Sequence, residues 1–386
     1  MDPMEKLPFV PRTWIDIDLD AVIANYHTAC SLTQATVTCV LKADAYGHGA
    51  RRVALALQEA GCASFAVSCA REALELRRRG IGGDILVMGL TEPGYLPALI
   101  REGVTLTVAS VEDLLQAQRA AASVGRRAIV HLKLDTGFHR LGFECTEEAA
   151  QAIARAMALC PDVEAQGVYS HLGLVNTELD EEQHARFVWM RDLLRKKGLA
   201  LPEEHLCDSI GLVRYPAWHG TRVRAGAFLF GVRPSRSQHM PFACLPTLAF
   251  RTTVAQIHEV EAGAIVGYGD DMPLTRDSRI ATLCAGYGDG LPRRLSNAVG
   301  QVLIRGVRCP IVGLICMDQA MVDVTDVPEA APGDVATLLG DGISLEEYSD
   351  WCHTNRNECI TILSRRPIRV YHQVGREDIL EDLLLD

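Results

Sequence analysis

The stretch Thr36–Ala50, TVTCVLKADAYGHGA, decides how the rest of the chain is interpreted. It begins with alternating β-branched and apolar residues, a pattern typical of a strand, and Lys42 stands where that run ends. The glycine-bearing turn YGHG follows, and a helical pattern from Arg51 to Ala60 is closed by Gly61. The stretch therefore predicts a strand, a turn and a helix, with a lysine at the C-terminal end of the strand.

The first part of the chain repeats this alternation of strand and helix. Helical patterns such as Val111–Ser123, which begins after Ser110 and ends before Gly125, separate the short apolar segments. This rhythm predicts a (β/α)₈ TIM barrel over residues 12–240. A doubly wound sheet is the alternative, although no G-x-G-x-x-G follows the first strand. The expected strands are Val37–Lys42, Ser64–Val67, Asp84–Met88, Thr105–Ala109, Ala128–Lys133, Gln166–Ser170, His205–Ser209 and Arg224–Phe230.

The rhythm changes after Pro234 to β-rich segments separated by turns. We therefore expect a smaller, mostly-β C-terminal domain over residues 241–386, with residues 1–11 as a candidate addition. The segment before Ala21 is a further candidate, because WIDIDL alternates like a strand. The expected strands are Leu248–Val260, Arg279–Ala285, Gln301–Ile304, Pro310–Ile315, Ala320–Val324 and Val335–Leu339.

Composition indicates the class of protein. The 386 residues are 48% hydrophobic and 23% charged, with a net charge of -11, which argues against nucleic-acid binding because that needs a basic surface. No stretch reaches the ~18 apolar residues of a membrane span, and the N-terminus lacks a signal-peptide pattern. The 13 cysteines are odd in number and contain no C-x-x-C pair. We therefore expect reduced thiols, no metal site and a cytoplasmic location.

The position of Lys42 suggests chemistry. In a parallel barrel the catalytic groups lie at the C-terminal ends of the strands. A lysine in apolar surroundings loses part of its preference for charge, and a neutral amine is what a Schiff base with a carbonyl cofactor requires. The alternative is a solvated lysine, which is the commoner fate of a lysine at a strand end.

The string K-A-D-A-Y-G-H-G resembles the pyridoxal-phosphate lysine motif of the alanine racemase family. Further motifs that resemble the family follow in family order, from RTWIDIDLDAV near the start to RRPIRVY near the end. The resemblance implies a TIM barrel with a β domain, pyridoxal 5'-phosphate as cofactor, and a homodimer with shared active sites. Lys42 would be both the attachment point and a catalytic base.

The resemblance also implies roles in the barrel. The segment HLKLDTGFHRLGF is similar to one in which the arginine, here Arg140, binds the substrate carboxylate and the lysine, here Lys133, is a carbamylation candidate. Arg224 would contact the pyridine nitrogen, and His171 would brace that arginine. Because arginine stays protonated, it leaves the ring nitrogen largely unprotonated, which weakens the electron sink and favours racemisation over transamination.

Phosphate binding would use hydroxyls and backbone amides. The matching positions are Ser209 in CDSIG, the hydroxyl of Tyr46, and the backbone around Gly226 and Ala227. The chain has Ala225 where the family usually carries proline, which matters little for main-chain contacts.

Racemisation needs a base on each face of the substrate Cα. Lys42 would serve one face, and Tyr268 in AIVGYGDDM resembles the tyrosine that serves the other from the partner subunit. Tyr287 in AGYGDGLPRR resembles a non-catalytic tyrosine of the site. Met317 in GLICMDQ matches the residue whose backbone amide meets the carboxylate.

Asn357 departs from the family pattern, because it stands where a tyrosine is usual. Asparagine is smaller and both donates and accepts hydrogen bonds, so a substrate with a β-hydroxyl could fit. The same replacement resembles serine-racemising members of the family. We therefore expect a racemase of alanine, serine or both. The alternatives are a related barrel decarboxylase and a non-catalytic cofactor-binding barrel protein.

Overall fold

A computed structural model describes residues 11–233, 242, 244–269 and 272–385. The chain divides into two compact units, which we call the barrel unit (residues 22–244) and the β unit (the described part of residues 1–21, with 245–386). The predicted boundary between residues 240 and 241 lies outside the described residues. So do residues 1–10 of the predicted N-terminal addition.

The barrel unit is built on eight parallel strands in the described chain, in the order β10-β2-β3-β4-β5-β6-β8-β9. The backbone N–H of Arg224 donates to the carbonyl of Cys207 at 3.0 Å, which links the two ends of this order and nearly closes the barrel. A short strand, β7 (Phe143–Glu144), pairs with β6. The strands are β2 (Thr36–Val40), β3 (Ser64–Val67), β4 (Asp84–Val87), β5 (Thr105–Val108), β6 (Ala128–Asp135), β8 (Val163–Tyr169), β9 (Glu203–His205) and β10 (Arg222–Ala225).

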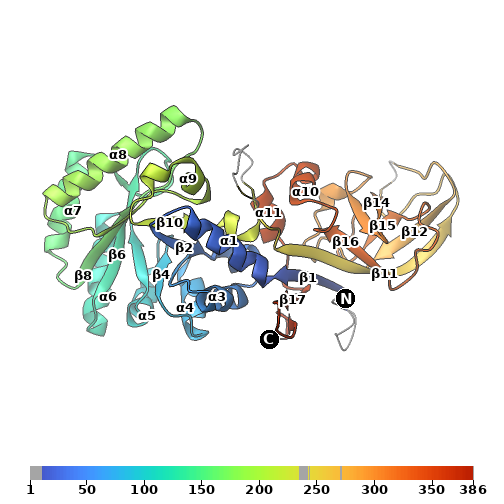
Figure 1. The fold of residues 1–386 in the computed structure, drawn as a ribbon, viewed down its shortest axis with the longest axis horizontal. Helices are drawn as coiled ribbons and strands as arrows, with labels where there is room; N and C mark the ends of the chain where they lie inside the picture. Colours follow the sequence, from blue (N-terminus) through green and yellow to red (C-terminus); the bar gives the residue numbers. More distant parts are fainter. Residues whose placement is uncertain (1–10, 234–241, 243, 270–271, 386) are drawn as a thin grey trace. The chain divides into compact units, whose positions relative to one another are not determined.

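Helices follow the strands and lie outside them (Figure 1). Local sequence sets their ends: Ser110 Oγ accepts from the N–H of Asp113 at the start of α6, and Gly125 ends that helix with φ 62°. The predicted barrel is therefore confirmed. The helices are α1 (Leu19–Ser31), α3 (Ala50–Glu59), α4 (Ala70–Arg78), α5 (Leu96–Arg101), α6 (Val111–Val124), α7 (Glu147–Ala158), α8 (Thr177–Lys196) and α9 (Ser209–Arg214).

Several predicted strands end early, and two in the barrel unit end four or five residues earlier than expected. The strand expected over His205–Ser209 is β9, which ends at His205, because Asp208 caps α9 by accepting from two of its backbone N–H groups. The strand expected over Arg224–Phe230 is β10, which ends at Ala225. Both strands end early where side-chain or loop contacts replace the backbone hydrogen bonds between strands.

The β unit is a second sheet, in the order β12-β15-β14-β13-β16-β11-β1-β17-β18. Its long strand β11 also pairs with β12, so six of these strands close a ring. In the described part of this unit, two α-helices accompany the sheet, α10 (Leu345–Cys352) and α11 (Arg356–Thr361). The strands are β1 (Thr13–Asp18), β11 (Leu248–Val260), β12 (Ser278–Leu283), β13 (Gln301–Ile304), β14 (Val307–Val312), β15 (Ala320–Asp323), β16 (Val335–Leu339), β17 (Ile368–His372) and β18 (Ile379–Glu381).

Strand β1 pairs antiparallel with β11 and parallel with β17. The barrel was predicted to start at residue 12, but the barrel unit starts at Val22. The reason is that β1 buries Trp14, Ile15 and Ile17 in the β unit. The N-terminal strand thus belongs to the sheet formed by the C-terminal half of the chain.

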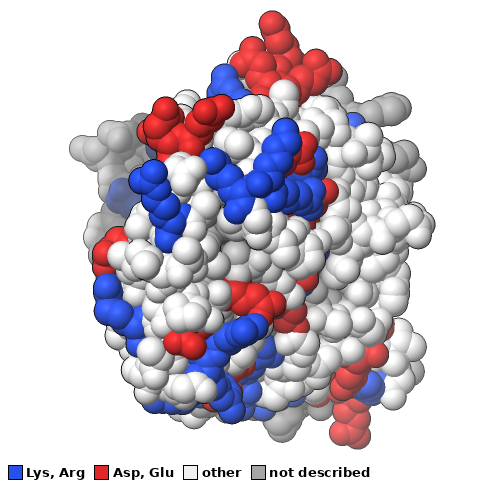
Figure 2. Space-filling view, turned by 90° about the vertical axis from the view of Figure 1, so that its left-hand side faces the viewer, with Lys and Arg blue, Asp and Glu red and all other residues white. Residues whose placement is uncertain are grey.

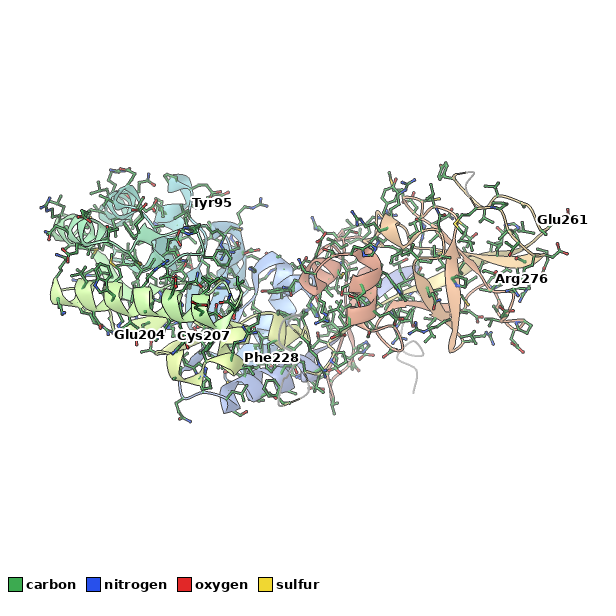
Figure 3. All side chains as sticks on the ribbon, turned by 90° about the horizontal axis from the view of Figure 1, so that it is seen from above. Tyr95, Glu204, Cys207, Phe228, Glu261 and Arg276 are labelled. Atoms are coloured by element: carbon green, nitrogen blue, oxygen red, sulfur yellow. The ribbon has the colours of Figure 1, made fainter. Side chains whose placement is uncertain are left out.

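Apolar side chains fill the interior of each unit. Cys207 and Phe228, labelled in Figure 3, are both fully buried in the barrel unit. On the face drawn in Figure 2, basic and acidic side chains occur together, so the net charge of -11 does not form a single acidic field there. Within the described residues, no helix has the length and apolar content needed to cross a bilayer.

Candidate active site

The turn that carries Lys42 (α2, Lys42–Tyr46) is left-handed. The four non-glycine residues after the lysine have φ between 52° and 55°, a conformation that costs L-residues about 1–2 kcal/mol each. Two carboxylates hold it. Glu72 Oε1 accepts from the N–H of Ala43 at 2.7 Å, and Asp44 Oδ1 accepts from the first N–H of α3, also at 2.7 Å. The glycine turn predicted here is therefore a strained loop fixed from both ends.

The amine of Lys42 lies in surroundings that disfavour its charge. Burial is the largest cause that lowers the pKa of Lys42, and the positive charge of Arg140 lowers it further, while the carboxylate of Glu72 opposes both. The Lys42 side chain is half-buried, with Nζ 6.0 Å from the centroid of the Tyr46 ring. A larger fraction of the amine is therefore neutral than in water, as a nucleophile requires.

Arg224 is buried in β10 and is held by several acceptors. Nη1 donates to Nδ1 of His205 at 2.7 Å, and Nη2 donates to the carbonyls of Ser170 and Leu206 at 2.8 and 2.9 Å. Nδ1 of His171 lies 3.4 Å from Nη2. Burial and the charge of Arg224 hold the pKa of His171 well below its usual range, so this ring is neutral. The two residues predicted to act together are in contact.

Three of the predicted phosphate contacts also converge. Oγ of Ser209, the first residue of α9, accepts from the N–H groups of Gly226 and Phe228 at 3.0 and 3.4 Å. A Cβ on Gly226 would lie 2.7 Å from the hydroxyl of Tyr46, so only glycine leaves that space open. Ala227 lies between the two donors. A hydroxyl cluster and a run of backbone amides therefore face one another.

Lys133 is almost fully buried in β6. Its Nζ donates to the carbonyls of Leu134 and Leu141 at 2.7 and 3.2 Å. Burial and then the charge of Arg224 lower the pKa of Lys133 to about 7. The amine is thus substantially neutral near pH 7, the form that can react with carbon dioxide.

Arg140 is exposed in the loop after β6. Its guanidinium lies 4.4 Å from the centroid of the Phe138 ring, and Phe138 packs edge-on against His171 with centroids 5.2 Å apart. Stacking on an aromatic ring restrains an otherwise mobile guanidinium. Phe138 therefore positions Arg140 beside the half-buried histidine.

The β unit brings three further predicted residues to one set of loops. Tyr268 forms an isolated bridge with Leu314, the N–H of Tyr287 donates to the carbonyl of Cys316 at 3.0 Å, and the next N–H donates to that of Met317 at 2.8 Å. Their side chains are 68%, 44% and 54% exposed for Tyr268, Tyr287 and Met317. Exposed large side chains on adjoining loops are typical of a surface that meets a ligand or a partner.

Asn357 is exposed in the first turn of α11, in the same unit. Its carbonyl accepts from Oγ1 of Thr361 at 2.8 Å. The segment after α11 reaches the loop that carries Tyr287, because the N–H of Ser364 donates to the carbonyl of Asp289 at 3.2 Å. The side chain of Asn357 is therefore free to meet solvent or substrate.

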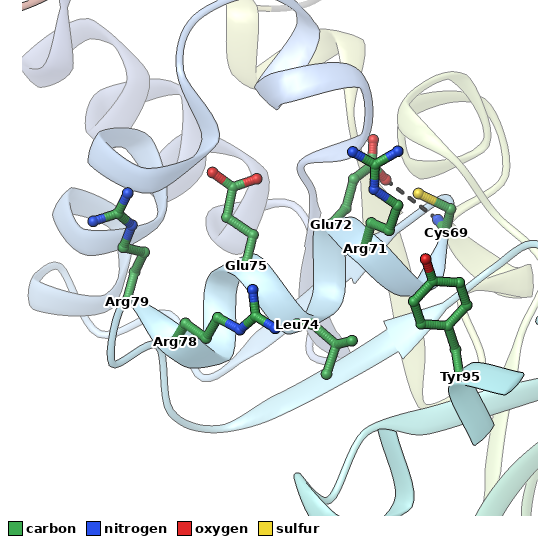
Figure 4. Close-up of a pocket in the computed structure, with 8 residues that line it drawn as sticks. All are labelled: Cys69, Arg71, Glu72, Leu74, Glu75, Arg78, Arg79 and Tyr95. Carbon is green, nitrogen blue, oxygen red and sulfur yellow. Dashed lines mark hydrogen bonds between the residues drawn. The ribbon is translucent and has the colours of Figure 1, made fainter. Parts of the chain in front are cut away.

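A separate groove of about 750 Å³ runs along the outer face of α4 (Figure 4). Its lining includes Cys69, Tyr95 and three arginines, but none of the residues predicted for catalysis. Glu72 lines it as well and accepts from the backbone N–H of Cys69, as the dashed line shows. The groove adjoins the lysine turn through this carboxylate, but it does not contain the lysine.

The sequence matches two family models in succession. The model described as "Alanine racemase, N-terminal domain" matches residues 17–234, and "Alanine racemase, C-terminal domain" matches residues 247–371. The chain belongs to the alanine racemase family. Related proteins include alanine racemase 1 of Caldanaerobacter subterraneus subsp. tengcongensis, 35% identical over 96% of this chain and 97% of that protein, and alanine racemase of Symbiobacterium thermophilum, 36% identical over 93% and 97%.

Solved alanine racemase structures have the same fold. The enzyme of Clostridium difficile 630 matches with a TM-score of 0.93 and 31% identity over 98% of this chain and all of that one. Alanine racemase from Bacillus anthracis, solved with bound L-Ala-P, matches with a TM-score of 0.92 and 30% identity, again over 98% and 100%. The likeness therefore extends over both units.

The cofactor of the alanine racemase family is pyridoxal 5'-phosphate, and the residues of this chain fit it. The amine of Lys42 has a lowered pKa, as attachment to an aldehyde requires. The Tyr46 hydroxyl lies against Gly226, where a Cβ would be 2.7 Å away, and the Ser209 hydroxyl, which accepts from the Gly226 N–H, can donate its own proton to a phosphate. Lys42, Tyr46, Ser209 and Gly226 would hold the cofactor.

Two residues that position functional side chains, Glu72 and His205, were not identified from the sequence. Glu72 holds the lysine turn, and its only local signal is its place three residues after Cys69, where it completes a capping box. His205 receives the hydrogen bond from Arg224 but is only the first residue of the predicted strand His205–Ser209, where a histidine gives no pattern of its own. Each acts through a partner far away in sequence.

Proposed function

We propose that the protein is a pyridoxal-phosphate-dependent racemase that interconverts L- and D-alanine. The observation that carries the proposal is the array in the barrel unit, where a lysine with a lowered pKa, a buried arginine and an amide-lined phosphate space come together. The family match over both units supports the same reaction.

Two bases would move the proton. When bound, the cofactor acidifies the Cα–H bond of the substrate by acting as an electron sink. Nζ of Lys42 serves one face of Cα, because its lowered pKa leaves it able to accept a proton near neutrality. The hydroxyl of Tyr268 serves the other face from the partner subunit of a homodimer. Its 68% exposure suits a residue that completes a site in another chain.

The other residues orient the substrate and the cofactor. Arg224, which stays charged, would contact the ring nitrogen of the bound cofactor, and neutral His171 braces this arginine. Arg140 binds the substrate carboxylate bidentately, with the backbone at Met317 as a second contact and Tyr287 beside them. Lys133, whose pKa is lowered to about 7, reacts as a neutral amine with carbon dioxide and releases one proton, and the resulting carbamate braces the loop of Arg140.

Asn357 gives the site a second candidate substrate, serine. Its exposed amide offers a donor and an acceptor where most relatives would carry a larger phenol, so a β-hydroxyl could bind without crowding. A site that hydrogen-bonds a substrate hydroxyl discriminates strongly against a substrate without that hydroxyl. An apolar site discriminates only weakly against a substrate that carries one.

A comparison of kcat/KM for L-alanine and L-serine, in the native protein and in Asn357→Tyr, tests both parts. We expect racemisation of both amino acids by the native protein. The substitution should lower serine turnover about tenfold relative to alanine, the effect of one lost hydrogen bond. Absence of alanine racemisation refutes the function, whereas an unchanged ratio refutes the role of Asn357.

A further inference from the structure

A line of polar side chains, buried except at its first member, runs through the interior of the barrel unit. It begins at Glu203, the first residue of β9, and ends at Arg224 near the C-terminal ends of the strands. Between them lie His131 of β6 and His205 at the end of β9, which are 0% and 1% exposed. Nε2 of His131 is 3.1 Å from Oε2 of Glu203, and Nδ1 of His131 is 2.9 Å from Nε2 of His205.

The donors along this line can be assigned from its two ends. Arg224 has only donors, so Nδ1 of His205, 2.7 Å from Nη1, must be an acceptor without a proton. Burial and the charge of Arg224 hold the pKa of His205 well below its usual range, so its one proton is on Nε2. That N–H donates to Nδ1 of His131, which leaves the proton of His131 on Nε2, facing the acceptor-only carboxylate of Glu203. The His131–His205 and His205–Arg224 hydrogen bonds then point the same way, and the 3.1 Å approach of Nε2 of His131 to Glu203 is an electrostatic contact without hydrogen-bond alignment.

We propose that Glu203 is a positioning residue for the cofactor. It fixes the tautomers of His131 and His205, and thereby keeps His205 an acceptor that holds the Arg224 guanidinium toward the pyridine ring. The positioning role of Glu203 rests on the proposed role of Arg224. The assignment of the tautomers does not depend on that role.

Neighbouring contacts fix the orientation of Glu203. Nη2 of Arg222 donates to Oε1 of Glu203 at 2.6 Å, and the same guanidinium pairs with Asp84. The ring of His131 packs against Gly167, where a Cβ would lie 2.7 Å from Nε2. The carboxylate and the first imidazole therefore have little room to change partners.

Replacing the Glu203 carboxylate by an amide should reverse the direction of the hydrogen bonds along this line. In Glu203→Gln, the donor-only guanidinium of Arg222 pairs with the amide oxygen. The amide N–H₂ must then face Nε2 of His131. His131 then carries its proton on Nδ1, and His205 carries its own on Nδ1, directly opposite a guanidinium N–H. Two donors facing each other in a buried site push the guanidinium away from its place.

Glu204 provides a matched control on the same strand. Because successive residues of a strand point to opposite faces, its side chain points away from that of Glu203, and it pairs with Arg191 and Arg195 of α8 at 3.0 and 3.3 Å. Glu204→Gln removes the same charge one residue away without touching the histidines.

The experiment is ¹⁵N NMR of histidine-labelled holoenzyme, with signals assigned through single His→Gln variants, followed by titration of the apoenzyme with pyridoxal phosphate. We expect Nε2–H tautomers for His131 and His205 in the native protein, a shift toward Nδ1–H in Glu203→Gln, and roughly tenfold weaker cofactor affinity for that variant alone. A native Nδ1–H tautomer on either ring overturns the proposal, and this result does not require Glu203→Gln to fold.

Two further results separate the possible failures. Equal cofactor affinity in the native protein and Glu203→Gln, with reversed tautomers, also overturns the positioning role. Equal losses of affinity in Glu203→Gln and Glu204→Gln do the same, because they indicate a general effect of charge. Failure of the native protein to racemise alanine would instead refute the proposed function, and it would leave the tautomer result as it stands.

Discussion

Glu72→Ala should loosen the turn that carries Lys42. The Glu72 carboxylate accepts three backbone N–H groups: that of Ala43 at 2.7 Å, that of Ser68 at 2.7 Å and that of Cys69 at 3.3 Å. It joins the start of α4 to the residue after the lysine. Alanine at position 72 leaves all three donors to water.

The size of the effect follows from these contacts. Loss of the helix-start bonds costs about 1 kcal/mol, as for other caps, and loss of the charge-assisted bond to Ala43 costs about 1.5 kcal/mol at this half-exposed position. The sum is about 2.5 kcal/mol. In a unit of this size it corresponds to a fall in melting temperature of about 5–10 °C. Because Glu72 raises the pKa of Lys42, its removal should also lower that pKa.

Thermal unfolding by calorimetry measures the first effect, and the pH dependence of cofactor attachment to Lys42 measures the second. Glu75→Ala is the control, since the exposed Glu75 carboxylate, one turn further along α4, has no hydrogen-bond partner within the described chain. We expect it to change stability by less than about 0.5 kcal/mol. Equal stability losses in the two variants, or an attachment profile that does not move to lower pH in Glu72→Ala, would refute the reasoning.

Three other predictions concern the same unit. Lys42→Ala should remove the visible absorption band of the lysine-bound cofactor, and a retained band would identify another lysine as the attachment point. The carbamylated fraction of Lys133 should rise as pH increases through about 7, because only the neutral amine reacts. ¹³C NMR with labelled bicarbonate measures this fraction. A carbamate signal that persists in Lys133→Met would place the carbamate on another residue. Gly226→Ala should weaken cofactor affinity at least tenfold, measured by titration, because its Cβ would displace the Tyr46 hydroxyl 2.7 Å away; unchanged affinity would argue against a phosphate there.

Much of the fold could be predicted because its signals are local. The strands Ser64–Val67, Leu248–Val260 and Val335–Leu339 have the predicted bounds, since apolar alternation between turn residues is readable in the sequence. The cap of α6 at Ser110 was readable for the same reason. The β1 strand was harder to assign, because its partners in β11 and β17 are more than 200 residues away.

The sequence by itself determined the order of strands and helices, the family, and the residue types available for chemistry. Short-range hydrophobic periodicity, turn residues and motif spacing are sufficient for these. Only the tertiary structure decided that the turn after Lys42 is left-handed, that Glu72 holds it, and that Glu203, His131, His205 and Arg224 form one line. These features depend on hydrogen bonds between strands and helices distant in sequence, and a donor or acceptor has a direction only once its partner is in place.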